Sequence, residues 1–293
     1  MSTPDVSIIV PSYNSTRTIV KCLQALQSQK TEFSYEIILI DSSDDGTGEL
    51  VESRFPEVKL IRLSQRTLPG EARNLGIQAA KAQILAFTDS DCVVEPCWLD
   101  RIARAHAGEG CAAVGGPVLN GLPLNPVAWA GYLLEFNGQL PSLPKRLVGF
   151  LPTCNVSFKA SVFKQHGLFP TDLWPCEDLI FGWYLHRAGQ QFLFDPEIRV
   201  RHIFRPKFGS FMQHQVRLGE ASAVARRQID LPHAWAATHP LRWLVPVVRL
   251  ARIEARLARW DPVNFLCFNL LLPLNLSGLC AWGVGFCKAS RRN

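Results

Sequence analysis

Negative charge is scarce in the last third of this 293-residue chain, and from Val263 to Cys287 there is no formal charge over 25 residues. From Arg199 onward, 15 Lys and Arg stand against 4 Asp and Glu, a net charge of +11. The part before Arg199 holds 16 basic and 21 acidic residues, a net charge of −5. This asymmetry indicates an anionic partner for the C-terminal part, either a membrane surface or a nucleic acid.

Paired cysteines and a secretory leader are missing as well. The nine cysteines include no Cys-x-x-Cys pair, and their odd number is typical of reduced thiols in a cytoplasmic protein. The N-terminal MSTPD runs straight into an apolar segment, without the basic and hydrophobic regions of a signal peptide. We therefore expect the catalytic part of the chain in the cytoplasm.

The first 116 residues alternate short apolar runs with helical patterns. Apolar runs of this length without polar alternation are typical of strands buried on both faces. Helices between them imply right-handed crossovers. The predicted strands are residues 6–10, 36–40, 58–63, 84–87 and 112–115, and the helices between them include 16–29 and 70–81. The predicted fold class is α/β, with a mostly parallel sheet flanked by helices.

Three polar clusters follow these strands, at Pro11–Asn14, Asp41–Asp45 and Asp89–Asp91. Such sheets bind ligands at the carboxyl ends of their strands, so we expect the clusters to meet at one edge. Asp89 and Asp91 can both reach one hard cation, such as Mn²⁺ or Mg²⁺, if the chain turns there. Asp41 can accept hydrogen bonds from a ribose or a base. The alternative for each cluster is a solvated turn.

Glu177 and Asp178 begin a predicted helix that is closed by Gly189. The helix dipole favours acidic residues at this end, and that structural role accounts for both of them. In the alternative interpretation, one of the two is a general base.

Six segments in order resemble the inverting glycosyltransferase family 2, with the nucleotide-diphospho-sugar transferase fold called GT-A. The resemblance covers about residues 5–220. It rests on VSIIVPSYNST, EIILIDSSDDGT, GEARNLGIQAA, ILAFTDSDCVV, TCNVSFKASVFKQHGLFP and CEDLIFGWYLHRAG. It implies an enzyme of glycan or polysaccharide biosynthesis that moves a sugar from a nucleotide-diphospho-sugar to an acceptor hydroxyl, with UDP as the expected nucleotide.

The resemblance also implies a donor site at the ends of the first strands. Its residues would be Pro11, Tyr13 and Asn14 beside the base, Asp41 at the base or ribose, Arg73 and Asn74 near the ribose or diphosphate, and Asp89 at the diphosphate.

By the same resemblance, the reaction depends on Mn²⁺ or Mg²⁺. Asp89 and Asp91 would form the metal-diphosphate motif, with Asp91 as the direct ligand and His202 near the ion. Asp178 would be the general base, with Glu177 beside it. The metal would offset charge on the leaving nucleotide diphosphate, and a single displacement implies inversion.

Two other functions stay open at this point. A sugar-nucleotide nucleotidyltransferase shares a similar fold, but we expect it to carry a Gly-rich loop where this chain has PSYNST. A catalytically silent membrane scaffold would have lost the Asp-x-Asp or Glu-Asp pair, and both are present.

Processive relatives carry Gln-x-x-Arg-Trp, and residues 213–218 echo it without the Trp, which favours a non-processive enzyme.

Residues 230–293 are predicted to be membrane-associated helices that follow a catalytic domain at 1–229. Within 248–260, four Arg share one helical face beside an apolar stripe, the pattern of a basic interfacial helix. The uncharged 263–287 is long enough to cross a bilayer, but Pro273 and the basic flanks favour in-plane or re-entrant helices.

A membrane location suggests a lipid-linked or glycan acceptor. The Leu, Val and Trp between the basic residues argue against nucleic acid. The alternative for these helices is packing on the catalytic domain or on a second subunit.

Overall fold

The computed structural model describes residues 3–108, 110–231 and 233–291, and they divide into two compact units. With those gaps, we call residues 3–119 and 144–203 the sheet unit, and residues 120–143 and 204–291 the helical unit. Residues 120–143 and 204–229, which we expected in the catalytic domain, therefore pack with the C-terminal helices. The domain limits 1–229 and 230–293 stay a prediction.

The sheet unit contains a mixed sheet. Its strands are β1 (Val6–Ser12), β2 (Tyr35–Asp41), β3 (Lys59–Arg62), β4 (Ile84–Phe87), β6 (Ala113–Gly115), β8 (Arg146–Val148), β9 (Val156–Lys159) and β10 (Phe192–Phe194). Their order is β3-β2-β1-β4-β9-β6-β10-β8. The first four are parallel, as is the pair β6 and β10, whereas β8 and β9 are antiparallel to their neighbours.

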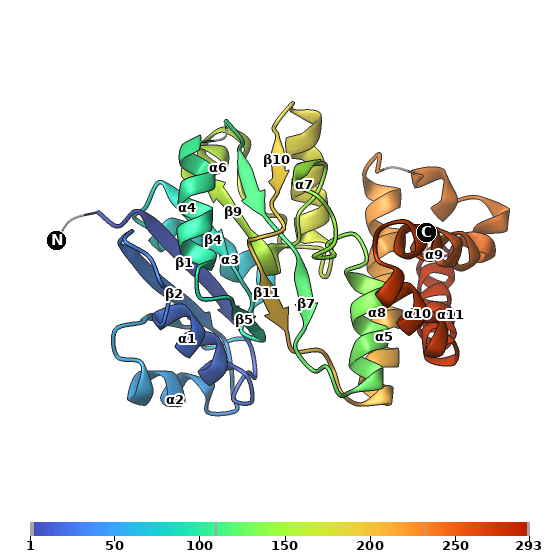
Figure 1. The fold of residues 1–293 in the computed structure, drawn as a ribbon, viewed down its shortest axis with the longest axis horizontal. Helices are drawn as coiled ribbons and strands as arrows, with labels where there is room; N and C mark the ends of the chain where they lie inside the picture. The colour runs from blue at the N-terminus through green and yellow to red at the C-terminus, as the bar shows by residue number, and fades with distance from the viewer. Residues whose placement is uncertain (1–2, 109, 232, 292–293) are drawn as a thin grey trace. The chain divides into compact units, whose positions relative to one another are not determined.

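Helices lie on both faces of this sheet (Figure 1). They are α1 (Ile19–Gln27), α2 (Thr47–Arg54), α3 (Pro69–Ala79), α4 (Trp98–Gly108), α6 (Ala160–His166) and α7 (Glu177–Arg187), with the short turn η1 (Thr153–Asn155). A smaller sheet has the order β5-β11-β7, formed by Cys92–Val94, Val200–His202 and Val118–Asn120. The predicted α/β class with a mostly parallel sheet flanked by helices is confirmed.

Close packing holds α3 against the centre of the sheet. β1 is buried along its whole length, as its mostly apolar sequence predicts. A Cβ at Gly76 of α3 would lie 2.4 Å from Cγ2 of Ile9 and 2.9 Å from Cδ1 of Ile40. Glycine is therefore required where α3, which carries Arg73 and Asn74, crosses β1 and β2.

The helical unit is assembled from segments far apart in the sequence. Its helices are α5 (Pro126–Glu135), α8 (Phe208–Gln228), α9 (Val245–Trp260), α10 (Pro262–Leu270) and α11 (Leu272–Ala289), with the short turns η2 (Ala234–Ala237) and η3 (Pro240–Leu244). A Cβ at Gly219 of α8 would lie 2.0 Å from the Trp282 carbonyl oxygen, and one at Gly285 of α11 would lie 2.0 Å from the Val216 carbonyl oxygen. These glycines let α8 and α11 pack backbone to backbone.

The uncharged segment 263–287 is divided between α10 and α11. Among the described residues, no single helix is long and apolar enough to cross a bilayer, but the bent pair α10 and α11, at 82° to one another, meets the length and composition together. Much of α11 is buried in the helical unit, with Trp282 and Phe286 in its core. Residues 117–150 contain α5, β7 and β8, although their many Gly, Pro and Leu residues predict a long irregular stretch.

Candidate active site

The ends of β1 and β2 meet in register, with Ser12 paired to Asp41. The Asp41 carboxylate is buried, and its Oδ1 accepts a hydrogen bond of 2.5 Å from Oγ of Ser43. Asn14 has a φ of +53°, a left-handed conformation that Asn adopts more readily than most residues. Its N–H donates to Oγ of Ser43 at 2.8 Å, and its side-chain oxygen accepts from the N–H of Asp44 at 3.1 Å. These bonds join the two loops that follow the strands.

Pro11 and Tyr13, at the end of β1, differ in their exposure to solvent. Pro11 lies within β1, buried and paired with Ile40, so it shapes the end of the strand without presenting a polar group. Tyr13 is exposed, and the guanidinium carbon of Arg66 lies 4.7 Å from the centre of its ring. We did not single out Arg66 from the sequence, because one basic residue in a polar loop carries no pattern.

Arg73 joins two acidic segments that are far apart in the chain. One guanidinium nitrogen lies 2.7 Å from Oδ1 of Asp89, and another lies 2.6 Å from Oε1 of Glu177. The side chains of Arg73 and Glu177 are 4% and 6% exposed, while that of Asp89 is 28% exposed. Buried charges are stable only when paired, so this network fixes the start of α7 relative to the end of β4.

Asn74 makes a second link from α3. Its Nδ2 donates to the Phe169 carbonyl oxygen at 2.8 Å, and its Oδ1 accepts from the Phe169 N–H at 3.0 Å. Since these bonds occupy both ends of the buried amide, the structure shows Asn74 anchoring the segment that leads to α7.

The Asp178 carboxylate lies half-buried at the N-terminal end of α7. It accepts hydrogen bonds from the N–H of Leu179 at 2.7 Å and from the N–H and Oγ1 of Thr153 at 3.3 and 3.4 Å. Burial raises its pKa to about 6, the charge of Glu177 acts in the same direction, and Arg73 opposes them. A carboxylate of this kind is ionised near neutral pH and still basic enough to accept a proton. Thr153 was not identified from the sequence.

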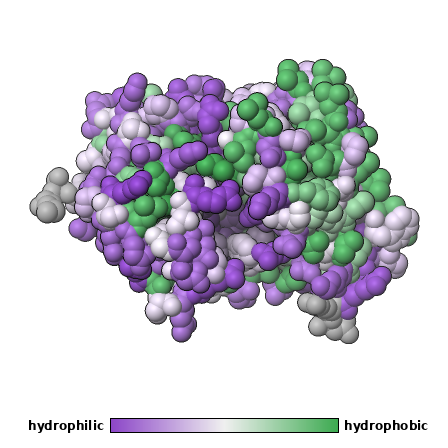
Figure 2. Space-filling view, turned by 90° about the horizontal axis from the view of Figure 1, so that it is seen from below, coloured by the Kyte–Doolittle hydropathy of each residue, from purple (hydrophilic) through white to green (hydrophobic). Residues whose placement is uncertain are grey.

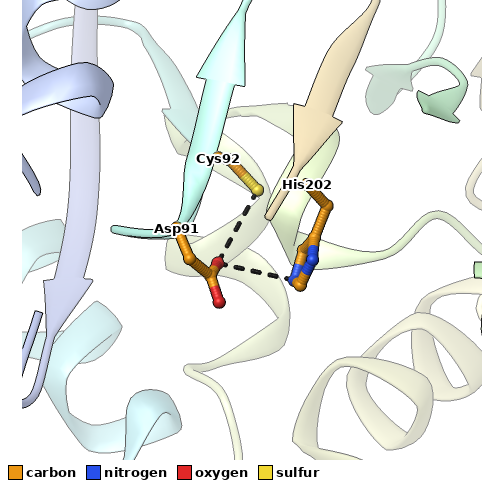
Figure 3. Close-up of side chains that lie close together, drawn as sticks. All are labelled: Asp91, Cys92 and His202. Atoms are coloured by element: carbon orange, nitrogen blue, oxygen red, sulfur yellow. Dashed lines mark hydrogen bonds and ion pairs between the residues drawn. The ribbon is translucent and has the colours of Figure 1, made fainter. Parts of the chain in front are cut away.

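Asp91, Cys92 and His202 come together at the start of the smaller sheet. The Cys92 thiol and the His202 ring face the Asp91 carboxylate from paired strands (Figure 3). Oδ1 of Asp91 lies 3.4 Å from Nε2 of His202 and 3.9 Å from Sγ of Cys92. The structure thus brings together the predicted metal ligands Asp91 and His202, and it adds a thiol that we did not predict there.

The loop between β4 and β5 is also tied to the first helical segment. Oγ of Ser15 lies 2.7 Å from Oγ of Ser90, and Sγ of Cys22 donates to the carbonyl oxygen of Asp89 at 3.5 Å. These contacts hold the loop in place, and its Asp89 and Asp91 side chains are partly exposed, at 28% and 34%.

Known proteins with similar sequences are glycosyltransferases or proteins of polysaccharide biosynthesis. The sequence model described as glycosyl transferase family 2 matches residues 7–167. The glycosyltransferase AglE of Haloferax volcanii is 31% identical over 269 residues, 90% of this chain and 82% of that protein. The succinoglycan biosynthesis protein ExoO of Rhizobium meliloti is 40% identical over 161 residues, 54% of this chain and 44% of that protein.

Solved structures show the same fold. The mannosyltransferase PcManGT from Pyrobaculum calidifontis, in complex with GDP-Man and Mn²⁺, has a TM-score of 0.62 at 21% identity and matches 98% of this chain and 88% of its own. Residues 1–349 of S. aureus TarS, in complex with UDP, give a TM-score of 0.52 at 18% identity over 96% of this chain and 90% of that one.

Proposed function

Because the chain belongs to glycosyl transferase family 2, we propose that it transfers a sugar from a nucleotide-diphospho-sugar to an acceptor hydroxyl with inversion at the anomeric carbon. The observation that carries this proposal is the Arg73 network, which links Asp89 of the Asp-x-Asp loop to Glu177, the neighbour of Asp178. One structural link therefore joins a candidate diphosphate site to a candidate base.

The donor nucleotide is proposed to bind where β1 and β2 end. The exposed Tyr13 ring offers a face for a base, and Asp41 and Asn14 offer acceptor oxygens for a base or ribose. Arg66, held over Tyr13, adds positive charge for a phosphate or a base. UDP is the first nucleotide to test and GDP the second, since TarS and PcManGT were solved with UDP and with GDP-Man.

The residues near Asp91 fit a divalent metal. A partly exposed carboxylate with an imidazole nitrogen 3.4 Å away can form two bonds to one ion and leave other positions to diphosphate oxygens. Asp89 is already paired with Arg73, so Asp91 and His202 would hold the ion directly, while Asp89 would orient the diphosphate region. When bound, Mn²⁺ or Mg²⁺ would stabilise negative charge on the leaving group.

Asp178 is proposed to be the general base. It would take the proton from the acceptor hydroxyl as that oxygen forms a bond to the anomeric carbon and the bond to the diphosphate oxygen breaks. Attack from the face opposite the leaving group inverts the configuration. Thr153 and the N–H of Leu179 would hold the carboxylate in position.

The chain is proposed to be non-processive. Gln215, in the segment that partly echoes the Gln-x-x-Arg-Trp motif, is buried in the helical unit, and its Nε2 donates to Oε1 of Glu135 at 2.9 Å. Gln215 therefore has a packing role within that unit.

The helical unit is proposed to bind a membrane surface, but by different residues from those first expected. The apolar stripe predicted within 248–260 consists of Leu250, Ile253, Leu257 and Trp260. Of these, Ile253 and Leu257 are buried, and the guanidinium of Arg249 stacks on Trp282. The exposed apolar residues lie elsewhere, and Figure 2 shows hydrophobic residues gathered over the C-terminal helices. They include Trp235, Leu241, Trp243, Val247, Val248, Val263, Leu266 and Leu270.

Exposed tryptophan and leucine beside basic residues are typical of a surface that enters the lipid headgroup region. Val263, Leu266 and Leu270 repeat at helical spacing along α10 and are 77%, 63% and 83% exposed. We infer that a lipid-linked sugar or glycan is the acceptor and that the catalytic part works on the cytoplasmic side.

The test is donor turnover by purified full-length protein in detergent or with vesicles. UDP-sugars and GDP-sugars are supplied with Mn²⁺, Mg²⁺ or EDTA, with a polyprenyl-linked sugar as acceptor, and release of nucleoside diphosphate is measured. Metal-dependent release that needs the acceptor, with an inverted product linkage by NMR, would support the proposal. Folded protein that releases no nucleotide from any donor would favour the silent scaffold.

A further inference from the structure

The cluster of Asp91, Cys92 and His202 includes the thiol of Cys92, a soft ligand that hard cations such as Mg²⁺ do not favour. Its three ligand atoms, a carboxylate oxygen, Sγ and an imidazole nitrogen, all lie within 4.8 Å of one another. Mg²⁺ and Mn²⁺ bind carboxylate oxygens well, but neither ion favours a thiolate ligand. Zn²⁺ and Cd²⁺, by contrast, favour thiolate together with imidazole.

Two of the three distances between ligand atoms are near those of a tetrahedral zinc site, and the third is below 4.8 Å. Zinc bonds of about 2.0–2.1 Å to O and N and about 2.3 Å to S, at tetrahedral angles, separate O from N by about 3.3 Å and O from S by about 3.5 Å. The structure has 3.4 Å for Oδ1 of Asp91 to Nε2 of His202 and 3.9 Å for Oδ1 to Sγ of Cys92. Side-chain shifts of a few tenths of an ångström would bring these two distances to the values of a zinc site.

The backbone holds these ligands together. Cys92 and His202 are directly paired across β5 and β11, so their side chains leave the same face of the smaller sheet. The Ile203 N–H donates to the Asp91 carbonyl oxygen at 2.8 Å, which fixes the third ligand. Cys92 is buried, but the Asp91 side chain is 34% exposed, so an ion can reach it from solvent.

We propose that Asp91, Cys92 and His202 form a binding site for thiophilic divalent cations of the Zn²⁺ and Cd²⁺ class, and that such a cation inhibits the enzyme by replacing the hard ion at Asp91. On binding, a metal–sulfur bond forms and the Cys92 thiol proton goes to solvent, without any redox change. A fourth position stays open to water. The inhibition rests on the proposed transferase function, whereas the binding does not.

The direct test is titration of the metal-free full-length protein with Cd²⁺, followed by the thiolate-to-cadmium charge-transfer absorption in the ultraviolet. The exposed Cys280 is replaced by Ser in every protein to remove a competing thiol. Cys92→Ser should lose the high-affinity band, and His202→Gln should weaken Cd²⁺ binding at least about tenfold. The matched control Cys111→Ser, which removes a buried thiol outside the cluster, should keep the band.

An unchanged band in Cys92→Ser, with circular dichroism showing folded protein, would overturn the proposal. If that variant does not fold, His202→Gln decides alone, and wild-type affinity for Cd²⁺ in this variant also overturns it. In a transfer assay with Mn²⁺, Zn²⁺ should inhibit the wild type at least about tenfold more strongly than Cys92→Ser. Mn²⁺-dependent transfer without a cadmium band would remove this site and leave the transferase proposal intact. A cadmium band without any transfer would support the cation site and contradict the transferase proposal.

Discussion

At the N-terminal end of α7, the half-buried carboxylate of Asp178 is partly desolvated, which raises its pKa. Its pKa of about 6 means that the base is about one tenth ionised at pH 5 and about nine tenths ionised at pH 7. Transfer should therefore rise with pH across this interval. Asp178→Asn should lower kcat at least about 100-fold, because the amide accepts no proton. A pH–rate profile of the wild type measures the first effect, and steady-state kinetics of Asp178→Asn at pH 7 measure the second.

The thermal stability of Asp178→Asn is the control for its loss of activity. The folded-state pKa of Asp178 is raised above its ordinary value, so the contribution of this group to folding falls as the pH rises from about 4 to about 6. Removing the charge should leave Tm at pH 7 no lower than that of the wild type, and nucleotide binding should persist. A variant that turns over near the wild-type rate would remove Asp178 from the role of base.

Arg73 is a second residue whose replacement has a definite expected cost. Arg73→Met leaves the carboxylate of Glu177 buried without its cation, which should lower the free energy of unfolding by about 3–5 kcal/mol in urea denaturation. Adding Glu177→Gln should recover part of the loss. Arg104 also contacts two carboxylates, those of Glu32 and Asp100, but it is exposed, so Arg104→Met should change stability little. Equal effects of Arg73→Met and Arg104→Met would contradict the account.

At the scale of elements, the position of α3 against the segment before α7 controls the site. A Cβ at Gly70, the second residue of α3, would lie 2.5 Å from the Pro170 carbonyl oxygen and 3.3 Å from Cγ of Glu177. Gly70→Ala should cost about 1–3 kcal/mol and weaken donor turnover, because it pushes Glu177 away from Arg73. Chemical denaturation and kinetics measure the two effects.

The matched control is Gly209, the second residue of α8, where a Cβ would meet nothing within 4 Å. Gly209→Ala should be neutral or should stabilise the protein by about 0.4–1 kcal/mol. If Gly70→Ala behaves in the same way, the close approach of α3 does not matter for the site.

Sequence patterns predicted the elements that follow local rules. β4 has the predicted limits, α7 ends one residue earlier than predicted, and Gly189 after α7 has the left-handed φ of +78° expected of a helix stop. α5 was missed because its sequence is apolar on nearly every side and shows no helical period, although Asn125 before Pro126 is a recognisable start signal.

The long-range contacts of the site could not be read from the sequence. Arg73 and Glu177 are separated by 104 residues, and β5 is a three-residue strand whose partner β11 lies about 100 residues away. No local pattern encodes such pairs, since they depend on how the whole chain folds. The same holds for the buried Ile253 and Leu257, which the helical wheel alone cannot distinguish from lipid-facing residues.

At the scale of the whole molecule, membrane attachment should depend on the exposed face of α10. Replacing both Leu266 and Leu270 by Glu should reduce flotation with anionic vesicles at least about tenfold, because each buried Leu contributes about 1.5–3 kcal/mol. Binding should also weaken with added salt, since basic residues contribute. Leu147→Glu, at an exposed site of the sheet unit, is the control. Equal flotation of the two variants would exclude α10 as the membrane contact.

A nucleotide diphosphate and a divalent metal are expected to bind together at the ends of β1, β2 and β4. Thermal shift with UDP, GDP, dTDP and CDP, each with Mn²⁺, Mg²⁺ or EDTA, tests it most directly in the wild type and in Asp91→Asn. At 100 times its dissociation constant, the correct nucleotide should add about 2.7 kcal/mol of stability. The account predicts that one nucleotide stabilises the wild type with metal, and that EDTA or Asp91→Asn removes the effect. Folded protein that responds to no nucleotide, or equally with EDTA, would contradict it.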